Sequence, residues 1–184
     1  MKNNYSKLAK EVDYLRKFRI NDRRRIILAL FLMFCVSLLS ILPAPAEEYQ
    51  ALNGVKTAKA VFDIRMSDPK GTALHLKVIQ QTFKDLIAEK KSPDFVLIFI
   101  GPSVKLVSTD RKSFAPEDQQ ALDEIAGTIS QMSTDGIRLE LCLVSAKVFG
   151  VDPSTVLKEI KTVGNGWVSE IGYQAQGYSL VPVY

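Results

Sequence analysis

The sequence predicts an α/β protein whose parallel sheet is covered by helices on both faces. Apolar segments of strand length alternate with amphipathic segments of helix length over most of the chain. The segment 94–100 is continuously apolar, which is typical of a strand buried on both faces of a parallel sheet. The composition, with 47% hydrophobic and 24% charged residues among 184, is that of an ordinary globular protein.

Local signals place the ends of the predicted elements. Asp68 and Pro69 begin the first helix, because proline fits the first helical turn. Pro116 begins a second long helix, and Gly150 and Gly177 end later ones. The elements predicted in order are a strand at 60–66, a helix at 70–90, a strand at 94–100, a helical turn at 102–107, a helix at 116–132, a strand at 137–143, short helices at 144–150 and 153–160, a strand at 161–163, a helix at 167–176 and a strand at 178–183.

The net charge divides the chain into two parts. Residues 1–46 carry nine Lys/Arg and three Asp/Glu, a charge of +6, whereas residues 47–184 carry fifteen and seventeen, a charge of −2. The body therefore offers no basic surface, and no nucleic-acid partner is predicted. One histidine and two cysteines cannot fill the usual zinc site, and no glycine-rich nucleotide motif is present, so no metal or cofactor is predicted.

The N-terminal residues have the parts of a secretory signal peptide. The arginines Arg23 to Arg25 precede an uncharged run at 26–42, and residues 44–46 form an A-x-A cleavage site. Without cleavage, the run is an N-terminal membrane anchor with the arginines on the cytoplasmic side. Either outcome predicts a periplasmic body that meets the membrane only through this segment. The predicted division is a signal peptide or anchor at 1–46, a lead-in at 47–57 and a domain at 58–184.

A candidate site follows from the fold, because open parallel sheets bind ligands beyond the carboxyl ends of their strands. Cys142 lies there, at a strand-to-helix junction, and is the only cysteine outside the N-terminal segment. Its apolar neighbours are compatible with a buried structural thiol. Alternatively, the start of the following helix lowers the pKa of the thiol and makes it a nucleophile. The candidate ligand-binding residues of this cleft are Arg65, Ser67, Gly101, Ser103, Ser145, Asn165 and Trp167.

Three motifs occur in order along the domain. Residues 101–106 are GPSVKL, residues 139–151 are LELCLVSAKVFGV, and residues 173–180 are YQAQGYSL. In order and spacing they resemble the DsrE/DsrF-like family. The resemblance implies a three-layer α/β/α domain with flavodoxin-like layering and a largely parallel five-stranded sheet. It also implies homo-oligomers, often trimers or hexamers. In the sulfur-relay relatives the equivalent cysteine, by position Cys142, carries a persulfide.

The sequence also departs from the family pattern. Leu143, Val144 and Ser145 follow the cysteine where many relatives have Gly-Asn-Thr, and Ile100 stands where many have histidine. Two hypotheses therefore stay open. In one, Cys142 carries sulfane sulfur between donor and acceptor proteins. In the other, the domain is a non-catalytic module that binds a small ligand or assembles into an oligomer.

Overall fold

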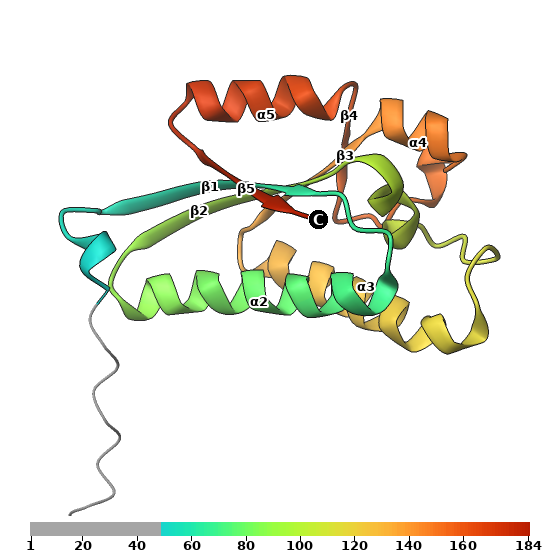
Figure 1. Ribbon diagram of the computed structural model, residues 1–184, viewed down its shortest axis with the longest axis horizontal. Coiled ribbons are helices and arrows are strands. Elements are labelled where there is room, and N and C mark those ends of the chain that lie inside the picture. Colours follow the sequence, from blue (N-terminus) through green and yellow to red (C-terminus); the bar gives the residue numbers. More distant parts are fainter. Residues whose placement is uncertain (1–48) are drawn as a thin grey trace, which may run out of the picture. The chain divides into compact units, whose positions relative to one another are not determined.

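The structure is a computed structural model that describes residues 49–184 (Figure 1). The predicted signal peptide or membrane anchor at 1–46 lies outside these residues. Among the described helices, none combines the length and the apolar character needed to cross a membrane. The elements in chain order are η1 (Gln50–Leu52), β1 (Thr57–Ile64), α2 (Pro69–Ala88), β2 (Ser92–Phe99), η2 (Gly101–Val107), η3 (Pro116–Asp118), α3 (Gln119–Thr134), β3 (Arg138–Cys142), α4 (Leu143–Phe149), η4 (Pro153–Thr155), β4 (Lys161–Val163), α5 (Gly166–Ala175) and β5 (Ser179–Val183).

The five strands form one parallel sheet with the order β4-β3-β2-β1-β5. Helices α2 and α3 cover one face of this sheet, and α5 lies over the opposite face (Figure 1). The expected α/β class and the three-layer architecture around a parallel five-stranded sheet are therefore confirmed. Strands β4 and β5 form the edges, and Pro182 of β5 lies in register with Asp63 of β1.

The two faces of the sheet bury different clusters, because successive side chains of a strand point in opposite directions. The larger apolar core lies beneath α2 and α3, and its strand residues include Phe62, Ile64, Leu97, Phe99 and Leu141. The cluster on the α5 face is small and consists of Val61, Val96, Ile98, Ile100, Cys142 and Tyr178. Cys142 therefore belongs to the smaller of the two buried clusters.

The predicted start of the first helix is confirmed. The Asp68 side chain accepts a hydrogen bond from the Gly71 N–H at 2.5 Å, and Pro69 occupies the first helical position. This cap satisfies one of the N–H groups that the first turn leaves without an internal partner. Strand β1 begins at Thr57, earlier than the predicted residue 60, because it pairs with β2 from Ser92 onward.

The helix predicted at 153–160 is wrong. Only the short 3-10 turn η4 forms at its start, and Val156 is extended, with a ψ of 140°. Val156 instead forms an isolated bridge with Ser108, and the Leu157 N–H donates to the Val107 carbonyl at 3.0 Å. These long-range contacts satisfy backbone groups that a helix would have satisfied internally.

Candidate functional site

Cys142 is the last residue of β3 and the N-cap residue of α4. Its Sγ accepts a hydrogen bond from the Ser145 N–H at 3.4 Å, and its side chain is buried, with 3% of the residue exposed. Burial by itself would raise the pKa of the thiol. Hydrogen bonds from Ser145 and from the backbone N–H groups of Gly166, Ser145 and Val144 outweigh burial and hold the pKa below its ordinary value of 9.0.

The start of α5 covers the thiol. A Cβ atom at Gly166 would lie 2.8 Å from Cδ1 of Ile100 and 3.1 Å from Cβ of Cys142, so only glycine permits this approach. Asn165 fixes the helix start, because its side chain accepts a hydrogen bond from the Trp167 N–H at 3.0 Å. The sulfur of Cys142 thus receives N–H groups from two helix starts while α5 separates it from solvent.

Three of the predicted cleft residues brace the strand ends. The Gly101 N–H donates to Oγ of Ser145 at 2.9 Å. The Ser103 hydroxyl lies 2.7 Å from the Ile64 carbonyl and 3.0 Å from the Ile100 carbonyl, and it is fully buried. These hydrogen bonds connect the ends of β1 and β2 to the start of α4, beside the cysteine.

The other predicted residues lie nearer to β1. Arg65 follows β1, and its Nε donates to Oδ2 of Asp63 at 2.6 Å. Its guanidinium also lies 5.9 Å from the centroid of the Trp167 ring, a cation–π distance. Ser67 is exposed in the segment that leads to α2. The structure therefore places Arg65 beside Trp167.

Three buried acidic residues, one on α5 and two on the sheet face that it covers, were not predicted from the sequence. They are Asp63, Glu140 and Glu170, which are 3%, 8% and 7% exposed. Glu140 accepts a hydrogen bond from the Tyr173 hydroxyl at 2.7 Å. Among the described residues, no hydrogen-bond donor is found for one oxygen of each, namely Asp63 Oδ1, Glu140 Oε2 and Glu170 Oε1. A signal was present, since Asp63 and Glu140 each stand inside an apolar strand pattern.

The environment of Glu170 favours its protonated form. Burial, the neighbouring charge of Asp63 and hydrogen bonding with Asp63 raise the pKa of Glu170 to about 7. Arg65 opposes this effect, with its guanidinium 3.9 Å from Oε1 of Glu170. Near neutral pH, Glu170 therefore exists in both protonation states.

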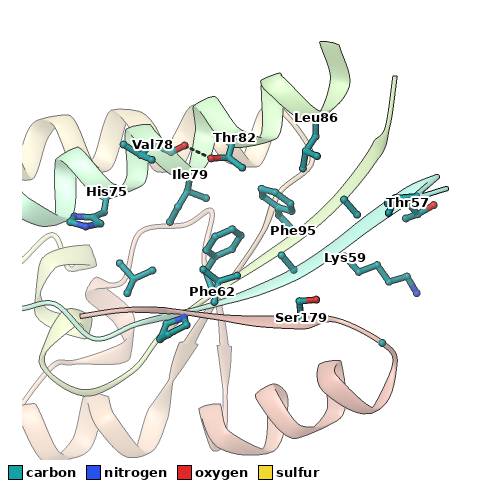
Figure 2. A pocket seen from close by; sticks show the side chains of 17 residues that line it. Thr57, Lys59, Phe62, His75, Val78, Ile79, Thr82, Leu86, Phe95 and Ser179 are labelled. Carbon is teal, nitrogen blue, oxygen red and sulfur yellow. Dashed lines mark hydrogen bonds between the residues drawn. The ribbon is translucent and has the colours of Figure 1, made fainter. Parts of the chain in front are cut away.

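A separate groove lies on the α2 side of the sheet, away from Cys142. Figure 2 shows it between α2 and strands β1 and β5, with Phe62, Phe95 and Ile79 forming its floor and wall. Its volume is about 710 Å³, and its lining is mainly apolar. None of the predicted cleft residues lines it. His75 lies at one end, where its Nδ1 is 2.8 Å from the Gly71 carbonyl.

Known proteins resemble the chain in sequence and in fold. An uncharacterised protein of Aquifex aeolicus (strain VF5) is 27% identical over 172 residues, which cover 91% of this chain and 70% of that protein. The structure of MTH1491, a protein of unknown function from Methanobacterium thermoautotrophicum, aligns with a TM-score of 0.54 and 17% identity. That alignment covers 68% of this chain and 99% of the other, and it supports the fold.

A second solved structure, the ychN protein of E. coli, aligns with a TM-score of 0.45 and 13% identity, covering 68% of this chain and 99% of that chain. The model of the DsrE/DsrF-like family matches residues 59–183, which is most of the described domain. This match contains the three motifs, the parallel sheet and Cys142 with its N–H donors. The chain therefore belongs to the DsrE/DsrF-like family.

Proposed function

We propose that this protein is a sulfur carrier that holds sulfane sulfur as a persulfide on Cys142. The observation that carries the proposal is the set of hydrogen-bond donors around Sγ, with N–H groups from Val144, Ser145 and Gly166. Such donors favour a sulfur anion over the neutral thiol, and the thiolate is the nucleophilic form. Membership of the DsrE/DsrF-like family supports the same role, because the segment around Cys142 resembles the cysteine segment of the sulfur-relay relatives.

The proposed transfer is a pair of thiol exchange steps that need no external oxidant. The Cys142 thiolate attacks the sulfane sulfur of a donor such as thiosulfate or a polysulfide. A new S–S bond forms, the bond in the donor breaks, and the leaving group, sulfite or a shorter polysulfide, takes the electron pair. An acceptor thiolate then attacks the outer sulfur, and Cys142 leaves as the thiolate, ready for another cycle.

The residues around Cys142 have separate tasks in this scheme. The N–H groups at the start of α4 and at Gly166 hold the negative sulfur before and after transfer. Ser145, which also receives the Gly101 N–H, keeps the α4 start against the end of β2. Because Gly166 covers Cys142, the start of α5 must move aside before a donor can reach the sulfur.

The proposal extends to location and assembly. The N-terminal segment supports export to the periplasm, so the sulfur donor and acceptor would be proteins or small molecules of that compartment. Exposed apolar side chains support a homo-oligomer, a trimer or hexamer, because such side chains are enriched where subunits meet. On α4 and α5 these are Val144, Val148, Trp167, Val168 and Ile171.

Intact mass measurement tests the proposal directly. The purified protein is incubated with thiosulfate or polysulfide, beside a Cys142→Ser variant and a matched Cys35→Ser variant that retains Cys142. We expect a gain of one sulfur mass in the wild type and in Cys35→Ser, which reductant removes. An unmodified wild type, or equal sulfur uptake and delivery by Cys142→Ser, would contradict the carrier role.

The groove between α2 and β5 favours a second candidate function, a module that binds a small apolar ligand. Its lining includes Phe62, Phe95 and Leu86, and its volume of about 710 Å³ is in the range of small-molecule sites. Binding of the fluorescent probe anilinonaphthalene sulfonate would be compared with a Val78→Trp variant, which fills the groove from an exposed position on α2. Equal binding by both proteins would count against this candidate.

A further inference from the structure

Access to Cys142 depends on how α5 is held against the sheet. At its start, Gly166 lies directly on Cys142. One turn later Glu170 is buried near Asp63 and Arg65, and beyond it the Tyr173 hydroxyl donates to Glu140. The only charged side chain that α5 itself contributes is Glu170. The charge balance at Glu170 therefore bears directly on whether this helix stays in place over the cysteine.

The described groups around Glu170 do not balance two negative charges. From β1 comes the Asp63 carboxylate, and just beyond β1 lies the Arg65 guanidinium. Tyr184, which follows β5, interacts electrostatically with Arg65. Glu140 of β3 accepts a hydrogen bond from the Tyr173 hydroxyl. One guanidinium thus faces two buried carboxyl groups, each with an oxygen that receives no hydrogen bond within residues 49–184. A single shared proton removes the excess charge.

We infer that the proton on Glu170 controls access to Cys142. While Glu170 is protonated, its pair with Asp63 carries one negative charge, which Arg65 balances, and α5 stays closed over the thiol. When the proton leaves, two buried carboxylates face one guanidinium, and the start of α5 opens toward solvent. Glu170 is in this view a positioning residue. The inference deepens the proposed function and rests on it only for the use made of the exposed thiol.

The direction of the pH dependence follows from linkage. The pKa of Glu170 is about 7 with α5 closed and returns toward its ordinary 4.5 when the helix opens into water. The closed state therefore binds the proton more tightly, and closure weakens as pH rises from 4.5 to about 7. Between pH 5 and pH 8 the open fraction rises by about seventyfold, and above pH 8 it changes little.

Alkylation of Cys142 by iodoacetamide measures this opening without any sulfur chemistry. The full chain is labelled over pH 5 to 8, and the modification is quantified on the Cys142 peptide by mass spectrometry. A Glu170→Gln variant, neutral at every pH, is labelled in parallel. The ratio of the wild-type rate to the Glu170→Gln rate cancels the ionisation of the thiol itself. We expect that ratio to rise by about seventyfold between pH 5 and pH 8.

Control variants separate this role from a general loss of structure. Glu117→Gln, at an exposed position in η3, should keep the wild-type pH profile. Asp63→Asn removes the neighbouring charge, so it should flatten the profile even if Glu170→Gln does not fold. A constant rate ratio from pH 5 to 8, or a wild-type profile in Asp63→Asn, would overturn the inference. Because alkylation needs no sulfur donor, failure of the persulfide role would leave this result unaffected.

Discussion

Replacement of glycine by alanine should have opposite effects on the stability of the domain at two positions of α5. At Gly166 an added Cβ would meet Ile100 Cδ1 and Cγ1 at 2.8 Å and Cys142 Cβ at 3.1 Å, whereas at Gly172 it would meet nothing within 4 Å. Real Cβ contacts are longer than 3.0 Å, and Ile100 is 5% exposed, so the neighbours of Gly166 have little room to move. Gly166→Ala therefore overpacks the layer beneath α5.

The magnitudes follow from packing and helix propensity. Overpacking of a filled interior costs about 1–3 kcal/mol, so Gly166→Ala should lower the free energy of unfolding by that amount. Gly172→Ala should raise it by about 0.5–1 kcal/mol, because alanine loses less backbone entropy than glycine in a helix. The two variants should thus differ by roughly 1.5–4 kcal/mol, summing the two effects.

Urea unfolding of both variants, followed by circular dichroism, checks the difference. The same samples allow Cys142 alkylation at neutral pH, which should be faster in Gly166→Ala because the displaced helix start no longer covers the sulfur. Equal unfolding free energies in Gly166→Ala and wild type would refute the close packing of Gly166 on Cys142. A Gly166→Ala variant that is more stable than the wild type, and whose Cys142 is alkylated more slowly, would refute this close packing still more directly.

Further predictions concern the layer beneath α5. As pH rises from 4.5 to about 7, the unfolding free energy of the wild type should fall by about 3 kcal/mol relative to that of Glu170→Gln. This magnitude follows from about 1.4 kcal/mol per unit of pKa, and urea unfolding of both proteins measures it. Tyr173→Phe leaves Glu140 without its donor and should cost about 1–3 kcal/mol by the same measurement. Ser145→Ala should raise the pKa of the Cys142 thiol, seen as a shift of its alkylation–pH profile to higher pH. An unchanged profile would mean that Ser145 does not stabilise the thiolate.

The layout of the sheet could be predicted from the sequence because its signals are local. The apolar run 94–100 forms the buried central strand β2, and Asp68 with Pro69 starts α2 as the capping pattern requires. Cys142 lies at the predicted junction of strand and helix, since the end of β3 is set by its own residues. Such features depend on neighbours in the chain, which a sequence displays directly.

Other features depend on distant residues and escaped prediction. The segment 153–160 has a helix-like start, but its backbone bonds to the chain near Val107, a contact that no local pattern shows. Likewise, the pairing of Asp63 with Glu170 joins β1 to α5 across more than a hundred residues. Burial of those carboxyl groups becomes visible only when the two elements are packed together.

Pro182 limits how copies of this domain can join. The Val183 carbonyl accepts from the Arg65 N–H, so Val183 bonds inward to β1 and the preceding residue faces the free edge of the sheet. Proline has no N–H to offer there, and a foreign strand added along β5 would lack a ladder bond at that point. The sheet thus resists extension from this edge, which guards the folded domain against strand-by-strand aggregation there.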